Sequence, residues 1–89
     1  MYKVIVAEGA ADFIRGQTKK IRRQLHNKIK NLRNNPYPSN CVKLKGQEDL
    51  YRIRSGDYRI IYTVKNKEVT ILVLRIAHRK EVYKRLTKG

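Results

Sequence analysis

The sequence predicts an α+β fold: an N-terminal strand, a helical hairpin and then an antiparallel β-meander, with both helices packed on one face of the sheet. Two patterns predict this order. Apolar residues recur at helical spacing in the first half of the chain, whereas they alternate with polar residues in the second half, between clear turn signals. A chain of 89 residues has room for one hydrophobic core. We therefore expect a single domain that covers residues 1–89.

The first half contains the predicted strand and both helices. Residues 2–7 (YKVIVA) have the pattern of a strand, which ends at Glu8-Gly9, and residues 10–15 can form a short helix. Thr18 is a plausible N-cap for a second helix that begins at Lys19 and ends before Asn34-Asn35-Pro36. The apolar residues of this second helix form one narrow stripe: Ile21, Leu25, Ile29 and Leu32. The rest of its surface is strongly basic.

The second half contains the meander. Residues 42–44 form a short extended piece, and residues 50–54 and 58–64 form a hairpin around Ser55-Gly56-Asp57. A further turn at residues 65–68 leads into the last strand, 69–76. Alternation assigns to the helix-facing side of the sheet Ile53, Tyr58, Ile60, Tyr62, Val64, Val69, Ile71 and Val73. It assigns to the other side Arg52, Arg54, Arg59, Ile61, Thr63, Thr70, Leu72 and Leu74. We expect the C-terminal segment or a partner chain to cover part of that mixed face.

Charge narrows the class of protein. The chain carries 22 Lys and Arg against 7 Asp and Glu, a formal charge of +15, which favours a polyanionic partner, nucleic acid first, or an acidic protein. The basic residues are not gathered beside an apolar anchor, no apolar run is long enough to span a membrane, and no signal peptide is visible. We therefore expect a cytoplasmic protein with no membrane partner. Cys41 is the single cysteine, which excludes an intramolecular disulfide.

Three arginines are predicted to share one patch of the sheet. If Gly56 and Asp57 are the turn residues, Arg54 lies directly opposite Arg59, with Arg52 two residues along on the same face. Like charges placed opposite each other destabilise a sheet, so such a cluster suits a phosphate, whose oxygens match the planar fork of a guanidinium. In an antiparallel meander, the strand 69–76 ends beside the start of the strand 58–64. His78, Arg79 and Tyr83 should therefore emerge near this patch.

These residues carry a family resemblance. KLKGQEDLYRIRSGDYRIIYTV followed by VLRIAHRKEVYKRL resembles the RelE family of the RelE/ParE toxin superfamily, the toxins of type II toxin–antitoxin systems. The resemblance implies a microbial RNase-like fold and an endoribonuclease that enters the ribosomal A site and cuts mRNA there without a metal or other cofactor. It also implies an acidic, RelB-like antitoxin as partner. Operator DNA would be reached only indirectly, through the toxin–antitoxin complex.

The same resemblance implies the site residues. The basic residues of the family match Arg52, Arg54, Arg59 and Arg79, its C-terminal tyrosine matches Tyr83, and His78 is our candidate for proton transfer at neutral pH. Additional nucleic-acid contacts are expected from Lys43 and Lys45 before the hairpin and from Lys28 and Arg22 on the basic helix. No metal-ligating residues are expected.

Three other functions fit the sequence. A ParE-like toxin shares the fold but inhibits DNA gyrase. A non-catalytic basic module would bind rRNA or DNA through phosphates alone, with an affinity that falls steeply with salt. A degenerate toxin would fold and bind antitoxin without cleaving RNA.

Overall fold

The computed structural model describes residues 1–46 and 49–81. The elements follow in the order β1 (Lys3–Val6), α1 (Glu8–Arg15), α2 (Lys19–Leu32), β2 (Val42–Lys43), β3 (Tyr51–Ser55), β4 (Tyr58–Lys65), the short 3₁₀ turn η1 (Asn66–Glu68) and β5 (Thr70–His78). This is the predicted α+β order, with most boundaries shifted by one or two residues. No helix in the described part of the chain is long and apolar enough to cross a membrane.

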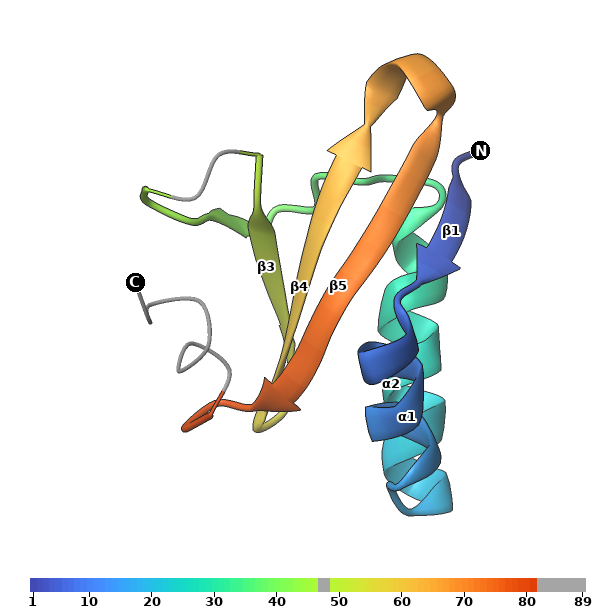
Figure 1. Cartoon of the computed structure of the whole chain (residues 1–89), viewed down its shortest axis with the longest axis vertical. Coiled ribbons are helices and arrows are strands. Elements are labelled where there is room, and N and C mark those ends of the chain that lie inside the picture. The colour runs from blue at the N-terminus through green and yellow to red at the C-terminus, as the bar shows by residue number, and fades with distance from the viewer. Residues whose placement is uncertain (47–48, 82–89) are drawn as a thin grey trace.

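One five-stranded sheet runs in the order β1-β5-β4-β3-β2. Strands β3, β4 and β5 form the predicted antiparallel meander, and β2 adds a short antiparallel edge. At the other edge β1 pairs in parallel with β5, so that Lys3 lies beside Thr70 and Val6 beside Val73. Figure 1 shows α1 and α2 side by side on the same side of the sheet. The first and last strands of the described chain are thus neighbours.

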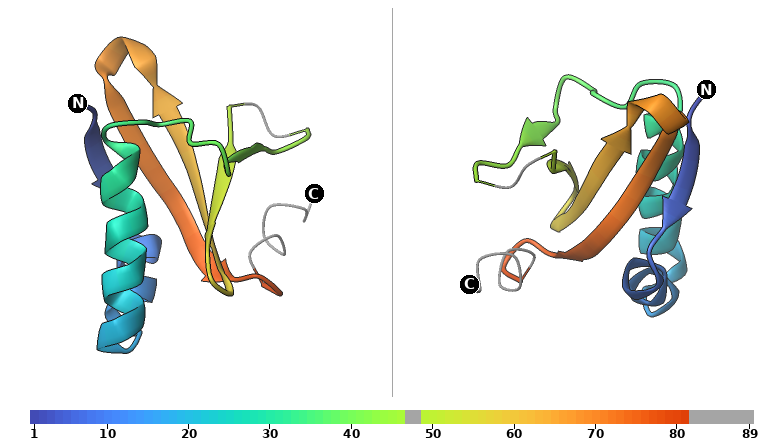
Figure 2. Two further views of the ribbon diagram at one scale, coloured as in Figure 1. Left: turned by 180° about the vertical axis from the view of Figure 1, so that it is seen from behind. Right: turned by 45° about the horizontal axis from the view of Figure 1, so that its top comes forward.

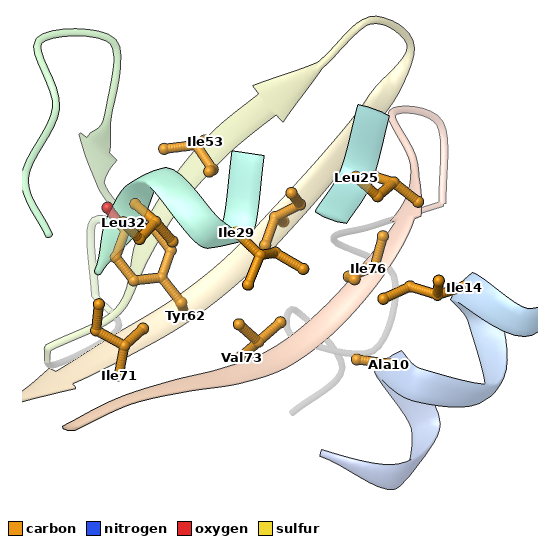
Figure 3. Close-up of a cluster of buried hydrophobic side chains, with 11 residues drawn as sticks. Ala10, Ile14, Leu25, Ile29, Leu32, Ile53, Tyr62, Ile71, Val73 and Ile76 are labelled. Carbon is orange, nitrogen blue, oxygen red and sulfur yellow. The ribbon is translucent and has the colours of Figure 1, made fainter. Parts of the chain in front are cut away.

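The core lies between the helices and the sheet. The stripe on α2 behaves as predicted, because Leu25, Ile29 and Leu32 are all buried. Figure 3 shows these α2 side chains above the sheet residues Tyr62 and Val73. Helix α1 contributes its two buried residues, Ala10 and Ile14, at the end of the sheet near Ile76.

The loop after α2 is anchored to this core. The predicted cap of α2 is present, since the hydroxyl oxygen of Thr18 accepts a hydrogen bond from the Ile21 backbone N–H at 3.3 Å. At the far end, the buried hydroxyl of Tyr62 donates to the Pro36 carbonyl at 2.8 Å. Burial raises the pKa of that Tyr62 hydroxyl well above its ordinary value, so it remains a donor. The loop from Arg33 onward therefore leaves α2 in a fixed direction.

A β-bulge changes the face assignment at the end of β5. Ile61 lies opposite Arg75, but Tyr62 lies opposite Val73, so one extra residue of β5 fits between them. From there to the end of β5 every side chain lies on the opposite face from the one that simple alternation predicts. Ile76 joins the core, and Leu74, predicted on the second face beside Leu72, is the extra residue and is 37% exposed.

The assignment of Val69 was also wrong. It was expected to begin the last strand with its side chain toward the helices. Instead it ends the turn η1 with a left-handed φ of 49° and is 47% exposed, and β5 begins at Thr70. The cause is local, because the four-residue turn tightens into a 3₁₀ turn that uses Val69 to reverse the chain.

The second face of the sheet is partly covered from within the chain. Ile61 and Ala77 are buried there against Leu44 and Leu50. The cover expected from the C-terminal segment falls mainly on residues 82–89, which lie outside the described residues, so it stays a prediction, as does cover by a partner chain. Leu44 and Leu50 flank the connection between β2 and β3. In Figure 2 the described residues of the connection between β2 and β3 lie on the side of the sheet away from the helices.

Candidate functional site

The turn between β3 and β4 positions two arginines. Gly56 has a φ of +60° and is the first of the two residues between Ser55 and Tyr58, the arrangement of a type II′ hairpin turn. Such a turn leaves no freedom in the strand register, and Arg54 pairs directly with Arg59 as predicted. Two cationic side chains of one face therefore stand side by side at the end of the sheet.

The chain after β5 brings a third arginine to the same turn. Tyr58 pairs with His78 and Arg59 with Ala77, so β5 ends beside the turn, as Figure 1 also shows. The backbone N–H of Arg79 then donates to the Asp57 carbonyl at 2.7 Å. This hydrogen bond holds Arg79 against the turn.

These segments enclose a hollow of about 590 Å³, called here the arginine concavity. It is lined by Lys28, Asn40, Arg54, Gly56, Asp57, Arg59 and Arg79. Four of the lining side chains are cationic and one is a carboxylate. Within residues 1–46 and 49–81, neither Lys28 nor the three arginines form an ion pair. Positive charge therefore clearly exceeds negative charge in the arginine concavity.

Arg59 is held in place by its own turn. Its guanidinium donates to the Gly56 carbonyl at 3.0 Å and to the Tyr58 carbonyl at 3.2 Å, and the side chain is half-buried. Arg54 and Arg79 are more exposed. The site thus combines one fixed guanidinium with two that can adjust to a ligand. Guanidinium groups stay protonated in proteins and offer paired donors, so this arrangement suits a phosphodiester and its additional charge in a transition state.

His78 lies on the other side of the sheet. Its ring stands edge-on to Tyr58, with centroids 6.0 Å apart, and Tyr58 in turn packs edge-on to Phe13 of α1. The Nδ1 atom of His78 accepts a hydrogen bond from the Lys80 backbone N–H at 3.2 Å. The bulge explains this position, because unbroken alternation along β5 would place His78 on the face of Arg54 and Arg59. His78 is near the turn, as predicted, but it does not line the arginine concavity.

The other predicted residues are more dispersed. Arg52 is half-buried opposite Val42 of β2, and it does not line the concavity. Lys43 is exposed on β2, Lys45 follows in the next segment, and Arg22 lies in the first half of α2. Tyr83 lies outside the described residues. The structure therefore brings together Lys28, Arg54, Arg59 and Arg79 from the predicted set.

Asn40 is a lining residue that the sequence did not suggest. Val42 pairs with Arg52, so two residues further along the same antiparallel register Asn40 comes beside Arg54. The position of Asn40 beside Arg54 can be inferred only once the register of β2 against β3 is known. A strand as short as β2 has too little pattern for its register to be predicted.

Comparisons with known proteins identify the class and then the family. Residues 5–83 match the sequence profile described as "ParE toxin of type II toxin-antitoxin system, parDE". The chain is therefore a toxin of a type II toxin–antitoxin system. It belongs to the ParE toxin family, within the RelE/ParE superfamily, and it resembles solved structures of RelE toxins.

Two of these structures cover almost the whole chain. The archaeal RelE–RelB complex from Pyrococcus horikoshii OT3 matches with a TM-score of 0.79 and 30% identity over 91% of this chain and 98% of that one. The isolated E. coli RelE toxin matches with a TM-score of 0.77 and 29% identity over 99% of this chain and 97% of that one. "Putative toxin RelE1" of Methanocaldococcus jannaschii is 34% identical over 59 residues, which are 63% of this chain and 66%, just under two thirds, of that protein.

Proposed function

We propose that this toxin is a ribosome-dependent endoribonuclease that cuts mRNA in the ribosomal A site and so inhibits translation. The observation that carries the proposal is the arginine concavity, where Arg54, Arg59 and Arg79 meet from three segments of the chain. A binding surface for phosphates needs only positive charge. This hollow also fixes one guanidinium at the turn and leaves two beside it, which is the arrangement needed to stabilise charge that develops at a single phosphate.

The reaction is an internal transfer at phosphorus. The 2′-hydroxyl of one nucleotide attacks the adjacent phosphate, the bond to the 5′-oxygen of the next nucleotide breaks, and a 2′,3′-cyclic phosphate and a free 5′-hydroxyl result. One proton leaves the 2′-hydroxyl and one reaches the departing 5′-oxygen. The arginines stabilise the extra negative charge on the phosphate oxygens in between. Arg52 would contact the same RNA further along β3.

Proton transfer needs a different type of group, because an arginine is not readily deprotonated. We propose His78 or Tyr83 of this chain, or the ribosomal RNA, for that role. His78 is close to the turn but shares the helix-facing side of the sheet with its cross-strand partner Tyr58, so it would act at the edge of the site. Lys43, Lys45 and Arg22 would hold the RNA or rRNA through phosphates alone.

The toxin would act in the cytoplasm, where ribosomes are, and would be silenced by an acidic RelB-like antitoxin. The P. horikoshii structure is a RelE–RelB complex, and an intact E. coli RelBE toxin–antitoxin complex matches with a TM-score of 0.76 and 30% identity over 88% of this chain and 96% of that one. Operator DNA would be bound only through the antitoxin complex.

The test is a toeprint assay on programmed ribosomes, with naked mRNA alongside. We expect wild-type protein to cut within the A-site codon only when ribosomes are present. Arg79→Ala should cut about 10²–10³-fold more slowly, the usual cost of removing one such donor. Arg23→Ala, which removes an exposed arginine of α2 outside the concavity, should cut like wild type. Equal rates for the two variants would refute the proposed role of the concavity.

A second function is favoured by one observation, the description of the matching profile as a ParE toxin. If well-folded wild-type protein leaves programmed mRNA intact, supercoiling by DNA gyrase is the next measurement. Inhibition of gyrase would place this chain with the ParE toxins in function. No inhibition, together with RNA binding that weakens steeply with salt, would make the concavity a non-catalytic binding surface.

A further inference from the structure

A smaller pocket of about 210 Å³ adjoins the arginine concavity and shares two lining residues with it, Lys28 and Asn40. Its apolar part consists of Leu32 and Ile53, which are 1% and 2% exposed, together with Pro38. Its remaining wall is formed by three asparagines: Asn31, Asn35 and Asn40. The two hollows are therefore neighbours: the arginine concavity is strongly cationic, and the smaller pocket is apolar with a rim of amides.

Several contacts of the backbone give this pocket a fixed shape. Lys28 and Asn31 lie three residues apart on α2 and so project from the same side of the helix, next to the buried stripe. Beyond α2 the side-chain oxygen of Asn35 accepts from the Tyr37 backbone N–H at 3.2 Å, and the Cys41 N–H donates to the Pro38 carbonyl at 2.9 Å. Together with the Tyr62–Pro36 hydrogen bond, these bonds hold the loop across the pocket.

The amides of the rim are available to a ligand. Among the hydrogen bonds of the described residues, none involves the side chain of Asn31 or Asn40. An amide side chain presents one acceptor and two donor hydrogens, the groups that pair with the edge of a nucleobase. An apolar floor with a few polar groups at the rim is typical of a site that binds a planar ring and fixes its orientation.

We propose that this pocket is a nucleobase subsite, which receives the base next to the phosphodiester held by Arg54, Arg59 and Arg79. The inference rests on the proposed function and extends it to sequence preference. Pockets for drug-sized ligands measure roughly 300–1,000 Å³, so this smaller pocket suits a single ring system with its sugar and phosphate outside. Lys28 and Asn40 line both hollows, so they would lie between the bound base and the bound phosphate. Unpaired RNA bases are recognised in this way, through their edges and faces.

The test is a titration of the full chain with sixteen dinucleotides, each 2′-O-methylated so that no attacking hydroxyl is present, and each carrying a 5′-phosphate. NMR at low salt follows the side-chain amide signals of Asn31 and Asn40. We expect saturable shifts of both signals and a spread of roughly 2- to 10-fold in Kd among the dinucleotides, the effect of one uncharged hydrogen bond. Asn31→Ala and Asn40→Ala should reduce this spread. Asn27→Ala, an exposed asparagine of α2 outside the pocket, should preserve it.

The outcomes separate this inference from the proposed function. A base preference that is lost in Asn40→Ala supports the subsite, even if the toeprint assay shows no cleavage. Cleavage by the wild type, combined with dinucleotides that shift the signals of Arg54 and Arg79 but not those of the asparagines, refutes the subsite and leaves the nuclease. No binding by any dinucleotide at low salt also refutes the subsite.

Discussion

The pairing of Arg54 with Arg59 makes opposite predictions for stability and for activity. Two like charges directly across a sheet cost roughly 0.2–1 kcal/mol. Arg54 is exposed, so solvent screens its charge and the lower half of that range applies, about 0.2–0.5 kcal/mol. In a domain of this size 1 kcal/mol corresponds to roughly 4–8 °C in Tm. We therefore expect Arg54→Gln to raise Tm by about 1–4 °C while it slows RNA cleavage by about 10²–10³-fold.

Thermal unfolding followed by circular dichroism measures the first effect. Any loss of positive charge relieves some self-repulsion in a chain of charge +15, so Lys30→Gln, an exposed cation of α2 outside the concavity, is the matched control. The excess stabilisation of Arg54→Gln over this control should disappear near 1 M salt, where the screening length is about 3 Å. An Arg54→Gln protein that is no more stable than the control at low salt would show that the two arginines do not repel, and the argument would fail.

Three further predictions address the turn, the core and the proposed role of His78 in proton transfer. Gly56→Ala places a side chain at a φ of +60° and should destabilise the protein by about 1–2 kcal/mol in urea unfolding, whereas Gly9→Ala in the first turn of α1 meets no atom within 4 Å and should be neutral or stabilising. Similar free energies for both would contradict the assigned turn. Tyr62→Phe removes a buried hydrogen bond and leaves the Pro36 carbonyl without its donor, at a cost of about 1–3 kcal/mol near pH 7. Because the folded pKa of Tyr62 is raised above the unfolded value of 10.0, its contribution is complete below pH 10 and declines above it, as the unfolded chain loses the proton first. Wild-type stability should therefore fall more steeply than that of Tyr62→Phe above pH 10, and parallel curves would refute this. His78→Ala should slow cleavage at neutral pH if His78 transfers a proton, and a rate equal to wild type in the ribosome assay would eliminate that role.

The fold was predictable wherever local signals and packing agree. The stripe on α2 has one possible neighbour, the apolar face of the sheet, and the Gly56-Asp57 turn determines the register of Arg54 and Arg59 without help from the rest of the molecule. The parallel pairing of β1 with β5 joins residues far apart in sequence, and no local pattern encodes it.

The site was predictable only in part for a related reason. The positions of Arg54 and Arg59 could be predicted from the hairpin turn, and that of Arg79 from the end of the last predicted strand. The position of His78 depends on a bulge that alternation cannot reveal, because an extra residue in a strand leaves both flanking patterns intact. Asn40 and the adjoining pocket depend on the path of a loop, which is set by a hydrogen bond from the distant Tyr62.

The position of β5 in the sheet affects when the protein can fold during its synthesis. This strand lies between β1 and β4 in the sheet, yet among the described residues it is the last strand to be synthesised. A nascent chain that has reached Lys65 still lacks β5, the strand with which both β1 and β4 pair. It also lacks the segment that carries Arg79. The pairing of β1 with β5 joins residues far apart in the sequence, so folding is delayed until β5 is available to form these contacts. The arginine concavity therefore cannot assemble until the message has been read past residue 79. A toxin with the proposed activity on mRNA would thus gain that activity only when its own synthesis is nearly complete.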